Sequence, residues 1–171
     1  MSAFRFIGLL VATFTLHSAP PSDVPRDFAI YFELGLCWRD VVDTRTDRYV
    51  RDLATRSGQT RTVRLRLSSM QWRDLSRWVE DSRFFELPTE ITASRFSVSE
   101  SGEMTSIIPS ANYVLDIRSG GRRHKVEFND DNPSATSDAL TRVRELVKRL
   151  EQFFTQLPQV RKLPEPAVGC L

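Results

Sequence analysis

Apolar and charged residues alternate along the stretch TRTVRLRL at positions 60–67. This period of two predicts a strand with one face toward a core and the other toward water. The period changes at the next residues. Ser68 and Gln71 fit a capping box, in which each side chain binds a free backbone N–H at the start of a helix. Apolar residues then recur at helical spacing. The helix should end near Arg83, because Pro88 cannot continue a helix. We therefore predict a strand followed directly by a helix.

Alternation and β-forming residues predict four further strands, at positions 28–34, 49–55, 111–118 and 123–128. The last two flank Gly120-Gly121, a pair that favours the positive φ angles of a two-residue hairpin turn. In the second, Tyr49 and Arg51 fall on the same side of the strand. We expect the stretch 35–46 to be a connection.

A second helix is predicted by six apolar residues that recur with spacings of three and four: Leu140, Val143, Val147, Leu150, Phe154 and Leu157. The repeat indicates a helix of about 20 residues with one apolar face, and Pro158 ends it. Asn132 is the predicted N-cap of this helix, with Pro133 at the first helical position.

The composition is that of a globular protein with one core: 171 residues, 40% hydrophobic and 10% aromatic. We predict a single α+β domain over residues 20–157 and an irregular, proline-rich tail over 158–171. The predicted fold is a two-layer sandwich, in which an antiparallel sheet of about five strands packs one face against two helices in the order βββαββα. The Ser- and Thr-rich segment 89–109 is long for a loop in a compact domain.

Residues 1–19 resemble a secretory signal peptide, because Arg5 precedes the apolar stretch 6–16. That stretch is far shorter than the roughly 20 residues of a membrane-spanning helix. We therefore expect no transmembrane helix and predict export to the periplasm or the cell exterior. The alternative is a cytoplasmic protein in which this stretch is a buried N-terminal strand.

Cys37 and Cys170 are the only cysteines, and their spacing fits no metal site. An oxidising compartment would favour a disulfide between them. Closing a loop of this length stabilises a protein by more than about 4 kcal/mol in the loop-entropy model. The alternative is an unstructured tail that leaves both thiols free.

No pattern in the sequence predicts catalysis or metal binding. His124 and Cys37 have the chemistry of a base and a nucleophile, but nothing in the sequence places them together. The cluster at 129–132 offers oxygen ligands for calcium but lacks the EF-hand pattern, and a turn with a helix cap accounts for it. We therefore assign no catalytic, cofactor-binding or metal-binding residue, and we expect no cofactor.

Six basic residues fall on the predicted strands or their turns: Arg64, Arg66, Arg118, Arg122, Arg123 and Lys125. On an open sheet face they would form a basic stripe. Sheets that bind nucleic acid interleave aromatic residues with such charges, whereas the outward neighbours here include Asp116 and Glu127. The mixed signs favour cross-strand ion pairs on a solvated face. The net charge of +2 is too small to imply nucleic acid or an anionic membrane as a partner by itself, and we expect nucleic acid not to be the partner.

A series of short motifs punctuates the chain: Gly35-x-Cys37-Trp38, Asp43-Thr44, Arg51-Asp52, Leu67-Ser68, Phe-Phe-x-Leu-Pro at 84–88, Pro-Ser-x-x-Tyr at 109–113, and Leu-Pro-Glu-Pro at 163–166. In these motifs the chain resembles small bacterial proteins, often exported, that are grouped only as families of unknown function. The resemblance covers roughly residues 28–170. The shared motifs imply turns in the structure and not catalytic residues, so the resemblance assigns no catalytic residue to this chain.

Three functions fit these patterns. The first is a non-enzymatic, exported interaction module, associated with the cell envelope and with a protein as its partner. The second is a small-ligand or enzymatic site under the 89–109 loop. The third is binding of an anion or a nucleic acid on the arginine-rich sheet face.

Overall fold

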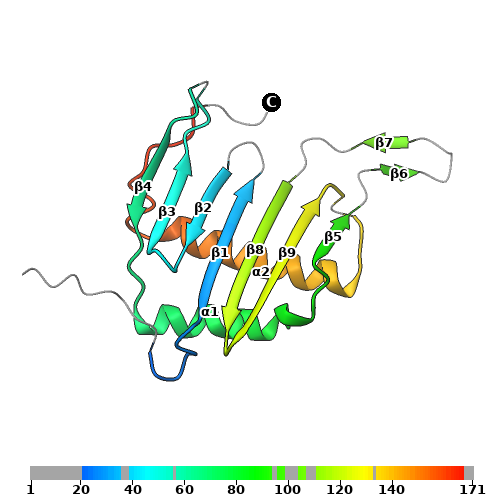
Figure 1. Ribbon diagram of the computed structural model, residues 1–171. Helices are drawn as coiled ribbons and strands as arrows, with labels where there is room; N and C mark the ends of the chain where they lie inside the picture. Colours follow the sequence, from blue (N-terminus) through cyan, green and yellow to red (C-terminus); the bar gives the residue numbers. More distant parts are fainter. Residues whose placement is uncertain are drawn as a thin grey trace, which may run out of the picture.

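The computed structural model describes residues 21–35, 39–55, 57–93, 96–98, 104–106, 111–132 and 134–167. Over these residues the chain forms two layers, a seven-stranded sheet and two long helices that both lie against one of its faces (Figure 1). A small two-stranded sheet extends beyond one edge of the large one (Figure 1). The predicted α+β class is confirmed.

The strands in chain order are β1 Ala29–Gly35, β2 Arg39–Asp43, β3 Arg48–Asp52, β4 Thr60–Arg64, β5 Glu90–Ala93, β6 Phe96–Val98, β7 Met104–Ser106, β8 Ala111–Ser119 and β9 Arg122–Asp130. The helices are α1 Ser69–Asp81, the short 3-10 helix η1 Phe84–Glu86, and α2 Asp138–Gln156. The large sheet has the order β4-β3-β2-β1-β8-β9-β5, and β6 pairs with β7.

Two strands of the large sheet lie where the sequence predicted none, so the predicted five strands and the order βββαββα are wrong in detail. β2 lies within the stretch 35–46. This stretch was expected to be a connection, because Arg39 and Asp40 interrupt its apolar pattern. β5 lies within the segment 89–109 and runs parallel to β9. The other neighbours in the large sheet are antiparallel. The sheet is therefore mixed rather than purely antiparallel.

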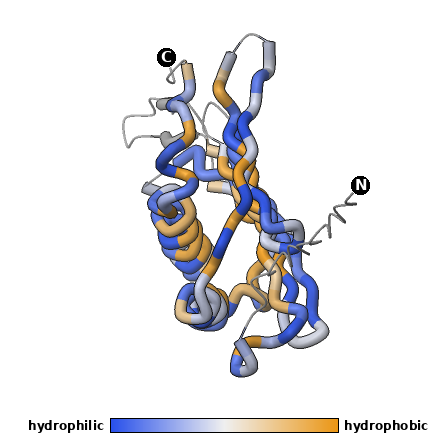
Figure 2. The backbone as a smooth tube through the Cα atoms, turned by 90° about the vertical axis from the view of Figure 1, so that its left-hand side faces the viewer, coloured by the Kyte–Doolittle hydropathy of each residue, from blue (hydrophilic) through white to orange (hydrophobic). Residues whose placement is uncertain are grey.

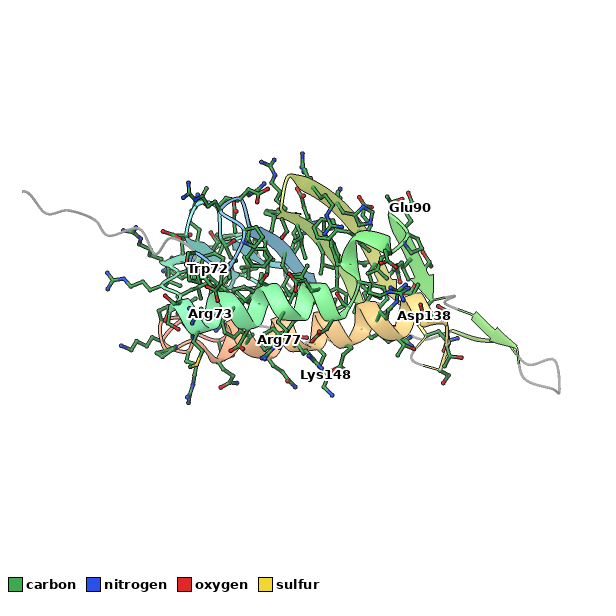
Figure 3. The ribbon with its side chains drawn as sticks, turned by 90° about the horizontal axis from the view of Figure 1, so that it is seen from below. Trp72, Arg73, Arg77, Glu90, Asp138 and Lys148 are labelled. Atoms are coloured by element: carbon green, nitrogen blue, oxygen red, sulfur yellow. The ribbon has the colours of Figure 1, made fainter. Side chains whose placement is uncertain are left out.

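The core lies between the sheet and the helices. Phe32 of β1 stands opposite Val42 of β2 and Leu115 of β8, and all three side chains are fully buried. Figure 2 shows apolar positions alternating along the strands and following one side of the helices. Figure 3 shows Trp72 on the sheet side of α1, whereas Arg77 lies on the far side. Burying side chains of this size stabilises the fold by about 1.5–3 kcal/mol each.

The predicted capping box of α1 is confirmed. The hydroxyl of Ser68 accepts from the N–H of Gln71 at 3.3 Å, and Oε1 of Gln71 accepts from the N–H of Ser68 at 2.8 Å. The helix ends just before Arg83, whose φ of 49° lies in the left-handed region. This residue turns the chain from α1 into η1.

α2 begins later than the sequence predicted. Ser137, not Asn132, is its N-cap, and its hydroxyl accepts from the N–H of Leu140 at 3.1 Å. Oδ1 of Asn132 instead accepts from the N–H of Ser134 at 3.0 Å, and Pro133 lies outside the described residues. Asn and Ser side chains serve both caps and turns, so the sequence alone did not separate these two roles.

Arg144 of α2 fixes the loop that precedes the helix. Its guanidinium donates to the carboxylate of Asp130, with Nη2 2.5 Å from Oδ1. It also donates to the carbonyls of Asn132 and Ala135, at 2.7 and 2.6 Å. One of the two carboxylates that the sequence offered as calcium ligands, that of Asp130, is thus engaged by an arginine.

Asp27 secures the hairpin turn between β8 and β9. Gly120 and Gly121 have φ of 59° and 78°, as their sequence predicts. The two carboxylate oxygens of Asp27 accept their N–H groups at 2.8 and 2.7 Å. The hydrogen bond from Gly121 does most to lower the pKa of Asp27, and the one from Gly120 adds to it.

After α2 the chain passes behind the β3–β4 end of the sheet (Figure 1). Val160 is completely buried, and the N–H of Ala167 donates to the carbonyl of Leu53 at 2.8 Å. None of the helices in the described residues is long and apolar enough to cross a bilayer. The predicted signal peptide, Cys37 and Cys170 lie outside the described residues, so export and the disulfide stay predictions.

Candidate functional site

A cavity of about 500 Å³ lies on the helix side of the sheet, at one end. We call it the Arg51 cavity. It is lined by residues of β1, β2, β3, β8, α2 and the chain after α2, namely Leu34, Gly35, Asp40, Arg51, Tyr113, Glu151, Thr155, Gln156, Arg161, Glu165 and Pro166. Most of these side chains are polar or charged. The volume lies within the range of about 300–1,000 Å³ that small-molecule sites occupy.

The register of the sheet turns two charged residues toward the core. Leu34 stands opposite Asp40 on β2 and opposite Tyr113 on β8. Arg51 follows Tyr49 by two positions on β3 and therefore faces the same side. Asp40 is only 5% exposed and Arg51 only 7%. Because burying charged groups costs several kcal/mol per ion, their presence here marks a candidate functional site.

Asp40 holds this charged corner together by accepting three hydrogen bonds. Its Oδ2 accepts from the hydroxyl of Tyr49 at 2.6 Å and from Nε of Arg51 at 3.4 Å. Its Oδ1 accepts from the N–H of Asp52 at 2.9 Å. The guanidinium of Arg51 also lies over the ring of Tyr49, with Cζ 5.7 Å from the ring centroid. These contacts fix the position of Arg51 at the cavity wall.

The same contacts set the charge states in this corner. Burial, and then the hydrogen bond to Asp40, raise the pKa of Tyr49 far above its usual value. Burial opposes the charge of Arg51, but contacts with Tyr49 and Asp40 outweigh this effect and raise the pKa of Arg51. At neutral pH Tyr49 is therefore a neutral donor, and Arg51 is a cation.

Glu151 of α2 and Tyr113 of β8 bring a carboxylate and a phenol to the cavity. Partial burial, and then the negative charge of Asp40, raise the pKa of Glu151 on α2. The ring of Tyr113 stacks on Phe32 and on Phe128, with centroids 6.2 and 5.6 Å apart. Burial, and then the charge of Glu151, raise the pKa of Tyr113 to about 12.

The chain after α2 closes one side of the cavity, which Arg161 and Glu165 line. The segment is anchored at both ends. The N–H of Arg161 donates to the carbonyl of Leu157 at 3.0 Å, and Ala167 binds Leu53 as described above. The wall is therefore held in place by backbone hydrogen bonds and not by side chains alone.

This arrangement suits an anionic group beside Arg51. Nε of Arg51 is engaged by Asp40, and within the described residues no other carboxylate pairs with its guanidinium. A guanidinium held in this way donates parallel hydrogen bonds to a carboxylate or a phosphate. Among the described side chains, no group of three or more His, Cys, Asp and Glu is placed to hold a metal ion.

The six basic residues singled out in the sequence are divided between separate parts of the molecule. Arg64 on β4 is separated from β8 by three strands and from β9 by four. Arg118, Arg123 and Lys125 lie exposed on β8 and β9. Arg66 lies exposed between β4 and α1. Arg122 instead stacks on the ring of Phe85, with Cζ 4.2 Å from the centroid.

Acidic neighbours engage several of these basic residues. Arg123 pairs across strands with Asp116, with Nη2 2.7 Å from Oδ2. Lys125 pairs with Glu127 on its own strand at 2.7 Å, and Arg64 pairs with Asp47 at 3.4 Å. The pair of Arg123 and Asp116 is of the cross-strand kind that the mixed sequence predicted, whereas Lys125 pairs within its own strand.

His124 and the segment 89–109 contribute nothing to the Arg51 cavity among the described residues. Nε2 of His124 lies 2.8 Å from the carbonyl oxygen of Leu87, and its ring meets Phe84 edge-on. Its hypothetical partner Cys37 lies outside the described residues.

The sequence did carry a signal for this cavity. Arg51 falls in phase with Tyr49 in the alternation of its strand, which places a charge on a buried face. Such a residue is rarely buried without a partner. Five residues of the short motifs line the cavity: Gly35, Arg51, Tyr113, Glu165 and Pro166. Asp40 and Glu151 had no comparable signal, because the strand β2 was not recognised and Glu151 lies on the polar side of the apolar repeat of α2.

Comparison with models of protein families gave no match, and neither did comparison with curated proteins.

Proposed function

We propose that this protein is a binding module, rather than an enzyme, that holds a small polar ligand in the Arg51 cavity through an anionic group of the ligand. One observation carries the proposal. Arg51 is a buried cation at the wall of a cavity large enough for a small molecule, and only Asp40 pairs with it among the described residues. A buried charge destabilises a fold unless it pairs with an opposite charge, and buried charges are often found where a ligand binds.

The support for binding comes from preorganisation. Asp40 and Tyr49 hold the guanidinium in place before a ligand arrives. A ligand carboxylate then forms charge-assisted hydrogen bonds without ordering a free side chain, which removes one cost of binding. The neighbouring Arg161 adds a second positive charge at the same cavity.

Titration of the labelled protein with acetate, succinate and phosphate, followed by backbone amide NMR, tests the proposal. We expect the shifts to concentrate at Arg51, Tyr113 and the end of α2. Arg51→Lys keeps the charge but loses the planar fork, so it should weaken binding on the order of tenfold. Arg48→Lys is the matched control, because Arg48 is exposed on the same strand and faces the opposite side.

The same titration discriminates the other sites considered. Shifts confined to β5 and its neighbours would favour a site under the 89–109 segment. Shifts on the outer faces of β8 and β9, at Arg118 and Lys125, would favour anion binding on the sheet face. Either result, or equal binding by the two lysine variants, would contradict the proposal.

We also propose that the module works outside the cytoplasm, because residues 1–19 have the pattern of a secretory signal. N-terminal sequencing of the protein from its own host should give a start near Ala19 or Pro20. Thiol titration of the same sample should find Cys37 and Cys170 paired. An intact Met1 with two free thiols would contradict both export and the disulfide.

A further inference from the structure

The charges that line the Arg51 cavity are of both signs. Arg51 and Arg161 are cations, whereas Asp40, Glu151 and Glu165 are acidic. A site for a simple anion has no need of acidic side chains at its wall, since like charges repel the ligand. The ligand should therefore carry a positive group as well as a negative one.

Asp40 and Glu151 differ in whether their carboxylate oxygens are free to bind a ligand. Both oxygens of Asp40 already accept hydrogen bonds, from Tyr49, Arg51 and Asp52. The side chain of Glu151 makes no hydrogen bond or ion pair with any described residue, although it lines the same cavity. Its carboxylate is thus open to a ligand, as is the carboxylate of Glu165 among the described residues, and Glu151 is the one of the two that lies on a helix and close to Asp40.

The electrostatics of Glu151 agree with this difference. Partial burial and the nearby charge of Asp40 both raise its pKa, and no cation among the described residues offsets them. A bound ammonium group would supply the missing positive charge and favour the ionised carboxylate.

We propose that the ligand of the Arg51 cavity is a zwitterion of amino-acid or dipeptide size, whose carboxylate binds Arg51 and whose ammonium group binds Glu151. This inference rests on the proposed function and makes it more specific. The two anchors come from opposite walls, Arg51 from β3 and Glu151 from α2, so the ligand spans the cavity. The volume of about 500 Å³ leaves room for a side chain between them.

Five-carbon probes of matched size test the inference by calorimetry or NMR. Pentanoate carries only the anion, pentylamine only the cation, and glutarate two anions. L-Norvaline and 5-aminopentanoate carry both groups, close together or far apart, and L-alanyl-L-alanine extends the series. We expect at least one zwitterion to bind about tenfold or more tightly than both pentanoate and pentylamine.

Glu151→Gln provides the second arm of the test. It should reduce the affinity for the zwitterion to the level of pentanoate and leave pentanoate binding equal or stronger. Glu145→Gln is the matched control, because Glu145 is an exposed glutamate on the same helix that does not line the cavity. It should leave the affinity for every probe unchanged.

The possible failures are distinct. If pentanoate or glutarate binds as tightly as the zwitterions, or if Glu151→Gln leaves zwitterion binding intact, the inference is overturned while anion binding at Arg51 stands. If no probe with an anionic group binds at the Arg51 cavity, the proposed function fails together with the inference. Binding of pentylamine alone would overturn both as well.

Discussion

The hydroxyl of Tyr49 donates a hydrogen bond to Oδ2 of Asp40 at 2.6 Å, in a corner where the tyrosine is fully buried and the aspartate nearly so. The two residues stand on neighbouring strands, β3 and β2. Their hydrogen bond ties the pairing of these strands to the wall of the Arg51 cavity. It also gives Asp40 a neutral donor in addition to the cation Arg51.

Removing that donor should destabilise the protein. Tyr49→Phe leaves a buried carboxylate with one hydrogen bond fewer, and we expect the free energy of unfolding to fall by about 1–3 kcal/mol. Urea denaturation measures the change. Tyr31→Phe is the control, because Tyr31 donates to Glu33 on the open sheet face, where the loss should be about 0.5 kcal/mol or less. Equal losses in the two variants would mean that the Tyr49–Asp40 bond has no special role.

The pair of Asp40 and Arg51 should behave as a coupled unit. Asp40→Asn or Arg51→Gln alone leaves one buried charge without its partner, and each should cost about 3–5 kcal/mol. The double variant should cost less than the sum of the two, by about 0.5–3 kcal/mol. A double-mutant cycle in urea measures this coupling. Strict additivity would show that the two charges do not interact in the folded state.

The tyrosines should resist ionisation in the folded protein. Burial, followed by neighbouring carboxylates, raises the pKa of Tyr31 and of Tyr113 from 10.0 to about 12, and that of Tyr49 further still. These are all the tyrosines of the chain. The unfolded chain releases its phenolic protons first as pH rises, so the free energy of unfolding should decrease from about pH 10 toward pH 12.

Tyrosinate absorbance against pH checks this expectation. The denatured protein should titrate near the ordinary pKa of about 10. The native protein should show little tyrosinate there, and its transition should come at higher pH, no later than the alkaline unfolding that exposes the phenols. A native titration centred near pH 10 would contradict the buried hydrogen-bonded arrangement.

Asp27 should protect the turn between β8 and β9. Its carboxylate accepts the N–H groups of both Gly120 and Gly121. Asp27→Ala should increase amide hydrogen exchange at these two glycines about tenfold or more, because both donors lose their acceptor. The pKa of Asp27 is lowered by these bonds, so the protection should be full above the ordinary pKa of 3.8 and decrease as pH falls below it.

Asp23→Ala is the control for this experiment. Asp23 is also exposed in the segment before β1, but its partner is Arg73 of α1. The Asp23→Ala variant should leave amide hydrogen exchange at Gly120 and Gly121 unchanged. Faster exchange in both variants would assign the effect to the whole segment rather than to the carboxylate of Asp27.

The sequence predicted the elements whose signals are local. The capping box of α1 and the Gly-Gly turn need only neighbouring residues, and both occur as expected. β2 and β5 are short, and they form strands because of the neighbouring strands with which they pair. Glu90–Ala93 becomes a strand because it lies beside β9, a fact that no local pattern contains.

The residues of the Arg51 cavity also divide into those with a local signal in the sequence and those without one. Arg51 was in phase with a buried tyrosine, so its burial could have been inferred from its own strand. Glu151 reaches the same cavity only because α2 crosses the sheet at that end. Its role depends on packing between elements far apart in the chain, which alternation and spacing do not encode.

The pairing of β1 with β8 has a consequence for the speed of folding. Ala29 stands opposite Arg118, so the centre of the sheet joins segments that are distant along the chain. Such contacts form slowly, because a long loop loses its freedom before the contact is made. The cavity is lined from both sides of this seam, by Arg51 of β3 on one side and Tyr113 of β8 on the other, and Glu151 of α2 lies at the same cavity. A bridging ligand would therefore arrive after the slow step, and it would lengthen the lifetime of the folded state without accelerating its formation.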